Sequence, residues 1–309
     1  MIDFLISRLI SAMLVVAGVV CLVFLLIHLI PGDPVDVMLG ESAQLVDRES
    51  LRHALGLDQP LFTQLIQYLS GLLQLDLGHS LHSEQSVVSL LAERIPATLQ
   101  LAFAAMLCAF LVALPMGILA AVKRGGVWDW GAMSFSALGI SIPNFWLGPM
   151  LILLFSLWLG WTPVSGRQSV SSLVLPAVTL GTGFAAILAR MIRSSLLEVL
   201  GEDYVRTARA KGLDESRVLW RHAMRNAWLP VVTLIGLQMG ALLGGAVVTE
   251  VVFDWPGIGS LMIDAIHKRD YPVVQGCVLF VSLAYVLINT LTDIVYGLVD
   301  PRIQHGGRV

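Results

Sequence analysis

Long uncharged, apolar runs separated by polar segments dominate the chain. A helix needs about 20 mostly apolar residues to cross the hydrocarbon core of a bilayer, and six runs reach that length. We therefore predict an all-α polytopic membrane protein, a single transmembrane domain over residues 1–309 with six spans. The predicted spans are residues 9–30, 97–122, 131–159, 170–193, 228–250 and 272–298.

The third run is longer than one helix needs, because no charged residue occurs from residue 130 to residue 166. Gly160, Trp161 and Pro163 favour a loop at its end. We interpret the run as one crossing to about residue 159, followed by a short interfacial loop. The first run lacks a small-residue cleavage site, so we expect a retained span rather than a removed signal peptide.

Two hydrophilic segments are too large to be simple connections. Residues 31–94 open with the turn formers PGDP and contain amphipathic stretches near 49–55 and 61–73, which predict a small external subdomain. In the second segment, residues 197–227, acidic residues favour a helix start near 202 and Gly212 is placed to end that helix. Asp214 then caps a second short helix. We expect these two helices to protrude into the cytoplasm.

The distribution of Lys and Arg orients the spans. With six crossings, 13 of the 19 basic residues fall on the side that holds both termini and residues 197–227. The opposite side holds six, and its 31–94 segment carries nine acidic residues. Because cytoplasmic segments are enriched in Lys and Arg, we predict that both termini are cytoplasmic and that residues 31–94 are external.

Composition agrees with this pattern and excludes several classes of protein. Hydrophobic residues make up 56% of the chain and charged residues 13%, with a mean hydropathy of +0.80. About a quarter of the residues of a soluble domain are charged, so a soluble enzyme and a nucleic-acid-binding protein are excluded. Cys21, Cys108 and Cys277 lie inside apolar runs without a C-x-x-C pair, so we expect neither a disulfide framework nor a thiolate metal site.

Motifs for chemistry on the chain itself are absent from the sequence. It contains no P-loop, no H-E-x-x-H and no G-x-S-x-G. His79 and His82 are three residues apart, but the serines beside them favour a solvated loop over a metal site. We predict no catalytic residue, no metal site and no cofactor bound by this chain.

Glycines recur in the fifth span at Gly236, Gly240 and Gly244. Steps of four residues place them on one helix face, which permits the close approach of another backbone. The stripe either packs within this chain or forms a seam with a central pathway or a partner span. Gln238, on the same span, either lines the pathway or forms a hydrogen bond between helices.

A few charged residues lie within or near the spans. Arg190 and Arg193 are at the cytoplasmic end of the fourth span, where we expect them to snorkel to the interface. Asp293 lies deeper in the sixth span, and we expect it to pair with a neighbouring helix, such as an Arg of the cytoplasmic segment. His28 and Glu250 lie near external ends, where we expect contact with water.

Motifs in a fixed order resemble those of a known family. They are PGDP at 31–34, LGLDQPL at 55–61, DLGHS at 76–80, RIPATL at 94–99, YVRTARAKGL at 204–213, RHAMRNA at 221–227, EVVFDWPGIG at 250–259, RDYP at 269–272 and DPR at 300–302. The set is similar to permease subunits of bacterial ABC importers, specifically the DppB-like branch for dipeptides, oligopeptides, nickel and glutathione. The resemblance implies the transmembrane domain of a type I importer in the bacterial inner membrane.

The resemblance also implies roles for particular residues. The 204–212 segment is similar to the family's coupling segment, which docks onto a separate ATPase subunit. It departs from importers of sugars, which carry Glu-Ala-Ala where this chain has Arg206, Thr207 and Ala208, so their ion pairs are not carried over. The implied coupling residues are Tyr204, Arg206, Thr207, Ala208, Arg209, Ala210, Lys211 and Gly212. Candidates for docking the binding protein are Asp33, Asp58, Asp76 and Asp254, and candidates for the pathway or packing are Gly236, Gln238, Gly240, Gly244 and Asp293.

The partners that the resemblance implies are a second, DppC-like permease subunit, two ABC ATPase subunits that bind ATP and Mg, and an external solute-binding protein. Contact with membrane lipid is expected, and contact with nucleic acid is not. Short peptides are the favoured substrates, with nickel chelates or glutathione as alternatives, because specificity in such systems resides mainly in the binding protein. A stand-alone secondary carrier is disfavoured by the few ionisable residues in the spans. A membrane-embedded enzyme is disfavoured by the absence of a catalytic cluster.

Overall fold

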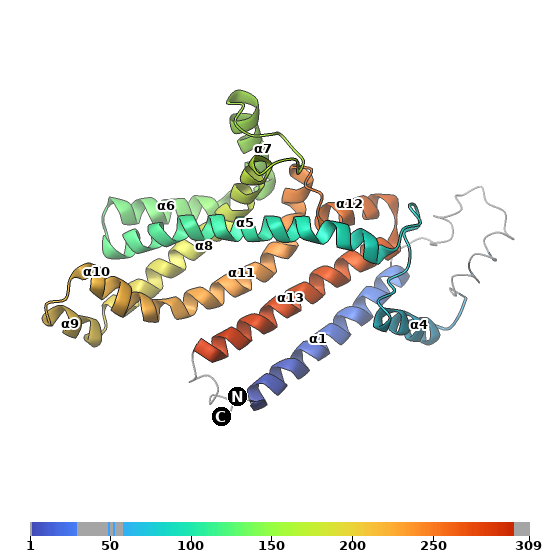
Figure 1. Ribbon diagram of the computed structural model, residues 1–309, viewed down its shortest axis with the longest axis horizontal. Helices are drawn as coiled ribbons and strands as arrows, with labels where there is room; N and C mark the ends of the chain where they lie inside the picture. Colours follow the sequence, from blue (N-terminus) through green and yellow to red (C-terminus); the bar gives the residue numbers. More distant parts are fainter. Residues whose placement is uncertain (1, 30–48, 50–51, 53–57, 300–309) are drawn as a thin grey trace.

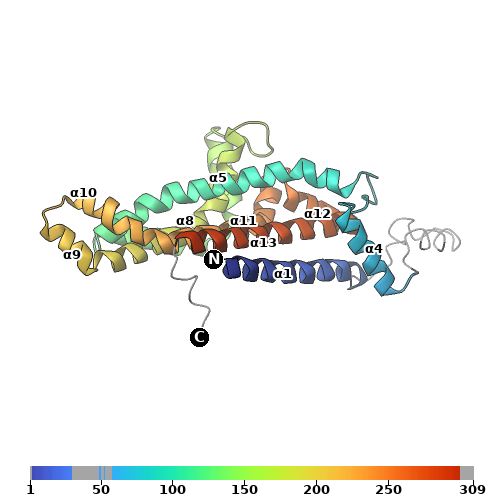
Figure 2. The same cartoon turned by 60° about the horizontal axis from the view of Figure 1, so that its bottom comes forward.

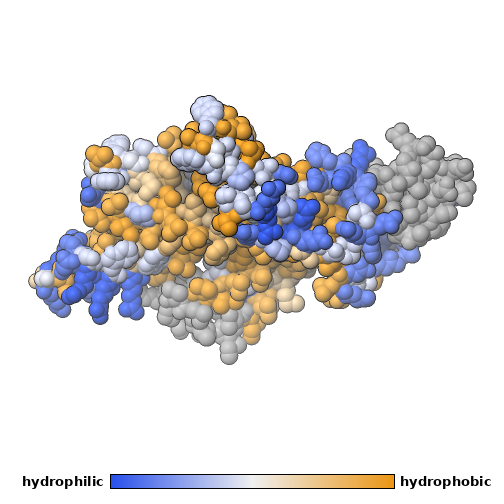
Figure 3. Space-filling view, turned by 45° about the horizontal axis from the view of Figure 1, so that its top comes forward, coloured by the Kyte–Doolittle hydropathy of each residue, from blue (hydrophilic) through white to orange (hydrophobic). Residues whose placement is uncertain are grey.

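The computed structural model describes the chain except residues 1, 30–48, 50–51, 53–57 and 300–309. All the elements named in the described part are helices (Figure 1). Asp33 and most of the stretch at 49–55 lie outside the described residues. In the space-filling view of Figure 3, hydrophobic residues cover much of the middle of the face and hydrophilic residues gather towards its two ends. This division is typical of a protein that spans a bilayer.

Five long apolar helices form the body of the described structure. They are α1 (Ile2–Leu29), α5 (Val87–Val122), α8 (Ser171–Leu200), α11 (Met224–Val252) and α13 (Tyr271–Val299). Each is long and apolar enough to cross a membrane. They run roughly along the long axis of the molecule in both ribbon views (Figures 1 and 2).

The third predicted span is not one helix. α6 (Val127–Ser141) is followed by α7 (Asn144–Leu151) and a π-helix over Ile152–Trp158, with a bend of 105° between the two parts. Pro143 causes the break, because the residue before a proline is driven out of the helical region, and Ile142 has φ −85° and ψ 117°. The crossing predicted at 131–159 is therefore made of two helical parts, and the bent pair, counted as one span, brings the candidate spans of the described part to six.

The second span begins earlier than its hydrophobic run suggests. α5 starts at Val87, where the hydroxyl oxygen of Ser86 accepts a hydrogen bond from the backbone N–H of Ser89 at 3.2 Å. Arg94 consequently lies inside the helix rather than in the external segment. The last residues of the segment predicted at 31–94 are thus helical and continuous with the second span.

Two shorter helices lie outside the long ones. α4 (Leu61–Leu73) coincides with the amphipathic stretch expected at 61–73. α12 (Ile258–Lys268) has no counterpart among the predicted elements, which leave the region between the spans at 228–250 and 272–298 unassigned. It packs against α5, α11 and α13 and ends at Arg269, which adopts the left-handed conformation with φ 56°.

Small residues let α5 and α8 approach closely. A Cβ at Gly181 of α8 would lie 2.7 Å from the carbonyl oxygen of Ala105, and one at Gly117 of α5 would lie 2.8 Å from that of Ala189. In a membrane, helices associate through such close packing rather than through a hydrophobic force between them. The two glycines therefore mark a tight α5–α8 contact at the centre of the bundle.

The glycine stripe of α11 packs within the chain over two of its three members. A Cβ at Gly236 would overlap Thr292, and one at Gly240 would lie 2.9 Å from Cδ2 of Tyr285, both on α13. A Cβ at Gly244 would meet nothing within 4 Å. Of the two alternatives left open by the sequence, packing within the chain therefore holds for Gly236 and Gly240, whereas Gly244 is exposed.

Gln238 lies beside this stripe but is buried. Both polar atoms of its side-chain amide lack a hydrogen-bond partner in the described part of the chain. It therefore forms no hydrogen bond between helices within the described part of the chain, and a place along the pathway stays a prediction.

Replacing Gly240 by leucine is expected to weaken the contact between α11 and α13. The new side chain would displace Tyr285, and overpacking of this kind costs about 1–3 kcal/mol. We expect lower abundance of the chain in the membrane, measured by immunoblotting. Leu237→Ala and Gly244→Leu are controls at exposed positions of the same helix and should leave abundance unchanged. Equal abundance of all three variants would contradict a tight seam at Gly240.

Two charged residues have surroundings that differ from those expected. Arg193 of α8 donates to both carboxylate oxygens of Asp129 in α6, from Nε at 2.6 Å and Nη2 at 2.9 Å. Arg193 therefore ties α8 to the broken span through a bidentate pair, and its expected place at the interface stays a prediction. Asp293 pairs with Arg8 of α1 at 3.2 Å rather than with an Arg of the cytoplasmic segment.

Candidate functional site

The segment between α8 and α11 forms one end of the molecule (Figures 1 and 2). It contains α9 (Asp203–Ala210), a single turn at Glu215–Arg217 labelled α10, and a π-helix over Val218–Ala223 that leads into α11. Asp203 lies in the first turn of α9, where a carboxylate is favoured by the helix dipole. The expected arrangement of helix, bend and helix is present.

Gly212 makes the bend. Its φ of 76° lies in the left-handed region, and its N–H donates to the carbonyl oxygen of Arg209 at 2.9 Å, which closes the last turn of α9. Asp214 then starts the next turn, with its carboxylate accepting from the N–H of Ser216 at 3.1 Å. The positive φ at Gly212 is the conformation that the sequence predicts.

α9 has one face towards the chain and one towards solvent. Val205 and Ala208 are buried against Val218. Ala208, one of the implied coupling residues, therefore packs inside the segment and is not part of the exposed face of α9. The exposed coupling candidates are Tyr204, Arg206, Thr207, Arg209, Ala210, Lys211 and Gly212.

The basic residues of this exposed face form only weak, solvent-exposed ion pairs within the described part of the chain. Arg206 pairs with Asp203 at 3.3 Å, and Arg209 pairs with Glu215 at 2.8 Å. Lys211 has no such pair in the described part of the chain. Exposed pairs of this kind contribute about 0–1 kcal/mol, so they are readily exchanged for acidic groups of a partner.

At the other end of α11, a buried carboxyl group joins three elements. Glu250 accepts a hydrogen bond from the Thr98 hydroxyl of α5 at 2.7 Å and another from the backbone N–H of Ser260 in α12 at 3.0 Å. The Thr98 oxygen in turn accepts from the N–H of Ile258 at 2.8 Å. The expectation that Glu250 contacts water is wrong, since its exposed fraction is 0%.

Trp255 reinforces the same junction. Its indole Nε1–H donates to the carbonyl oxygen of Ala97 in α5 at 2.8 Å, and its side chain is buried. Together with Glu250, it fixes the EVVFDWPGIG turn against the start of the second span. The three elements α5, α11 and α12 therefore form one unit at this end of the molecule.

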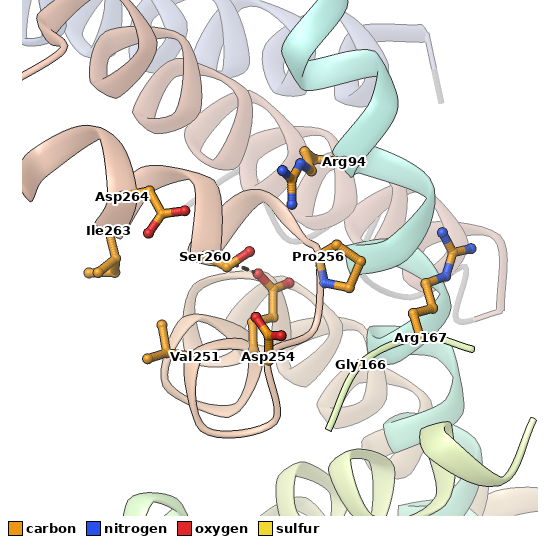
Figure 4. A pocket seen from close by; sticks show the side chains of 10 residues that line it. Arg94, Gly166, Arg167, Val251, Asp254, Pro256, Ser260, Ile263 and Asp264 are labelled. Atoms are coloured by element: carbon orange, nitrogen blue, oxygen red, sulfur yellow. Dashed lines mark hydrogen bonds between the residues drawn. The ribbon is translucent and has the colours of Figure 1, made fainter. Parts of the chain in front are cut away.

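A charged cavity of about 450 Å³ opens beside this junction. The side chains of Arg94, Arg167, Asp254 and Asp264 line it, with Arg94 and Asp264 coming from different helices (Figure 4). Asp254, one of the docking candidates, is exposed and has a φ of 48°. The cavity thus has charged walls and lies at the end of the molecule opposite to α9.

The other described docking candidates, Asp58 and Asp76, flank α4 and do not line this cavity. Asp76 is exposed in the turn after α4 and accepts a hydrogen bond from the N–H of Gly78 at 2.9 Å. Asp58 is exposed shortly before α4, and Asp33 is outside the described residues. Of the three candidates that the structure describes, only Asp254 lines the cavity.

Sequence reasoning missed a second buried carboxylate at this end. Asp270 accepts from the Ser80 hydroxyl at 2.5 Å and from the N–H of Leu81 at 3.2 Å, which anchors the loop before α5 to the start of α13. Ser80 belongs to the DLGHS motif and Asp270 to the RDYP motif. The sequence therefore shows both motifs, but not that their side chains form a hydrogen bond. Nearby, Nε2 of His82 lies 2.7 Å from the carbonyl oxygen of Lys268.

The described residues hold no group of three or more His, Cys, Asp or Glu side chains arranged to bind a metal ion. The arrangement instead consists of a protruding helix at one end and a braced, charged surface at the other, joined by long apolar helices. This geometry suits a membrane component that transmits movement between partners on opposite sides.

Comparison with known proteins shows to which family of membrane components the chain belongs. Residues 113–305 match the family described as the inner membrane component of binding-protein-dependent transport systems, and residues 1–102 match the N-terminal part of such membrane components. The chain belongs to this family and is a permease subunit of an ABC importer in the DppB-like branch.

Individual relatives match over nearly the whole chain. The di/tripeptide transport permease DppB of Pseudomonas aeruginosa is 49% identical, over 93% of this chain and 94% of the relative. The dipeptide permease DppB of Escherichia coli K12 is 45% identical over 99% of both chains. The glutathione permease GsiC of Escherichia coli K12 is 44% identical, over 99% of this chain and 100% of the relative.

Solved structures agree on the fold. An inward-facing form of the MetNI methionine ABC transporter aligns with a TM-score of 0.58 at 22% identity, and covers 68% of this chain and 96% of the solved chain. The fold is therefore the transmembrane domain of a type I ABC importer, as the motifs imply.

Proposed function

We propose that this chain forms half of the translocation pathway of an importer for short peptides. The observation that carries the proposal is the 45–49% identity to di- and tripeptide permeases over nearly the full length. The glutathione permease is a close second at 44% identity, and glutathione is itself a modified tripeptide. Peptides therefore come before nickel chelates as substrates.

In the proposed mechanism, ATP is hydrolysed on two separate ATPase subunits. ATP and Mg bind there, and closure of these subunits pulls on α9 and its counterpart in a second, DppC-like permease subunit. Since α9 follows α8 after a short turn and leads into α11 through α10 and the π-helix over Val218–Ala223, its movement reorients the spans. A binding protein delivers peptide at the opposite end, and both partners contribute the differential contacts that a population shift requires.

Uptake into vesicles tests the proposal. The complete complex, reconstituted with its ATPases and peptide-loaded binding protein, should accumulate a labelled dipeptide only with ATP and Mg. Unlabelled glutathione and a nickel chelate are the competitors. Accumulation driven by a proton gradient without the ATPases would favour a secondary carrier, and transport of nickel alone would overturn the peptide assignment.

Both termini and α9 are proposed to lie in the cytoplasm. In a background lacking Cys21, Cys108 and Cys277, a cysteine at the exposed Gln85 should react with an impermeant maleimide added to intact spheroplasts. A cysteine at the exposed Ser216 should react only after permeabilisation. Labelling of Ser216 but not Gln85 in intact cells would reverse the orientation and remove the basis for coupling through α9.

A further inference from the structure

α4 has three distinct faces. At 100° per residue, Gln64, Tyr68 and Leu72 share one side and are partly buried. Thr63, Gln67 and Ser70 share a second, polar side. The third side carries four large apolar residues with exposed fractions from 39% to 89%, namely Phe62, Ile66, Leu69 and Leu73.

The partly buried side attaches α4 to the outer part of α1. The ring of Tyr68 lies 5.7 Å from that of Phe24, and Leu72 packs against the cluster that contains Val20 and Val23. α1 continues to Leu29, so α4 packs beside the last turns of this helix and not beyond its end. Both ribbon views place α4 across the end of α1 that is remote from the N-terminus, oblique to the helix axis (Figures 1 and 2).

The level of α4 matters because α1 is apolar there. Leu22 and Leu25 flank Phe24 and are exposed to 59% and 45%. These side chains belong to a helix that crosses the bilayer, so their apolar surface faces lipid or another span. Leu22 and Leu25 lie on the side of α1 away from Phe24, so they show the depth at which α4 packs, a level where α1 still exposes apolar side chains.

The composition of α4 fits the boundary between lipid and water. Its 13 residues include no Asp, Glu, Lys or Arg, and its polar side carries only uncharged groups. Two of these are already hydrogen-bonded, since Gln67 donates to Gln59 at 3.0 Å and Ser70 donates to the carbonyl oxygen of Gln67 at 2.8 Å. A surface that docks a soluble protein reversibly would be wetted between encounters, whereas four adjacent large apolar side chains are stable in the acyl region.

We propose that α4 is an interfacial helix whose Phe62, Ile66, Leu69 and Leu73 insert into the outer leaflet. A helix at the bilayer surface needs one face towards protein, one towards lipid and one towards water. The three faces of α4 meet this requirement. α4 then anchors the external end of α1 at a fixed depth. This role is independent of the substrate that the importer carries.

Spin-label accessibility tests the proposal directly. Single cysteines at Ile66 and Leu69 on the apolar side, and at Thr63 and Ser70 on the polar side, are labelled with a nitroxide in the complete complex in lipid nanodiscs. Collisions with oxygen, which concentrates in lipid, are compared with collisions with a water-soluble nickel chelate. The oxygen-to-nickel ratio should be several-fold higher at 66 and 69 than at 63 and 70.

The alternatives give different readings. Nickel accessibility at all four sites would place the apolar side in water and overturn the proposal. Protection of 66 and 69 from both reagents would mean that protein covers this side, which also overturns it, and repeating the measurement without the binding protein would show which subunit does so. Peptide uptake by each cysteine variant establishes that the labelled complex is folded, so failure of the proposed function remains separable from failure of this inference.

Discussion

Gly212→Val is expected to abolish transport while the chain reaches the membrane at normal abundance. Gly212 has a φ of 76°, and a Cβ at this position would meet no atom within 4 Å. The substitution therefore creates no clash with a neighbour, and its whole effect comes from the backbone. A β-branched residue adopts this conformation only as a genuine outlier, at a cost of order 1–3 kcal/mol.

The segment can relieve that cost by moving. α9 is held by the small contact of Val205 and Ala208 with Val218 and by exposed polar contacts such as the Arg209–Glu215 pair, so a change of φ at Gly212 displaces α9 from the turn at Glu215–Arg217. The long helices satisfy their backbone hydrogen bonds internally and are not affected. Uptake should fall at least tenfold, and the ATPase subunits should copurify in lower yield.

Gly212→Asn is the matched control, because asparagine tolerates the left-handed region far better than valine. It should retain most of the transport. Ala210→Asp adds a charge to the exposed face without touching the buried one, so it reports on docking rather than on folding. Wild-type uptake by both Gly212→Val and Ala210→Asp would remove α9 as the transmission element and direct attention to residues 214–223.

The coupling segment was predictable because its determinants are local. An acidic helix start, a glycine in a left-handed position and a capping aspartate all act within a few residues, and the structure has each of them where the sequence predicts. The orientation of α9 was not predictable. Which side of an eight-residue helix is buried depends on Val218, which belongs to the next element.

The long helices were predictable for a different reason. Burial in lipid demands an uninterrupted apolar run, so hydropathy alone locates α1, α5, α8, α11 and α13. The same uniformity hides the 105° bend, since the residues on both sides of Pro143 are equally apolar. The conformational effect of Pro143 on Ile142 was the one local signal for that break.

Contacts between distant segments were beyond sequence reasoning. Glu250 and Thr98 are 152 residues apart, and Arg193 and Asp129 are 64 apart. The sequence shows each of these polar residues near an apolar run but not its partner. Glu250 was therefore expected in water, although it is among the most buried side chains of the described structure.

Glu250→Ala is expected to lower the stability of the end of the protein opposite to α9 and to reduce transport strongly. The substitution leaves the Thr98 hydroxyl and the Ser260 N–H without their acceptor, and each buried orphan group costs about 1–3 kcal/mol. It also detaches the start of α12 from α5, because Thr98 itself accepts from Ile258 and would be free to rotate. The melting temperature of the purified complex should fall by several degrees, and uptake should fall with it.

The conservative variant Glu250→Gln separates the loss of the carboxylate oxygens as hydrogen-bond acceptors from the loss of side-chain volume. Glu250→Gln keeps the size of the side chain and can still accept from Thr98, but its amide NH₂ then faces the Ser260 N–H, so an intermediate loss is expected. Asp254→Asn, on the exposed part of the same turn, is the matched control and should leave the melting temperature unchanged. If Glu250→Ala melted like the parent complex, the carboxyl group would not brace α5, α11 and α12. The charged cavity beside it would then be supported by the other hydrogen bonds between this turn and the second span, from the Trp255 indole to Ala97 and from the Ile258 N–H to Thr98.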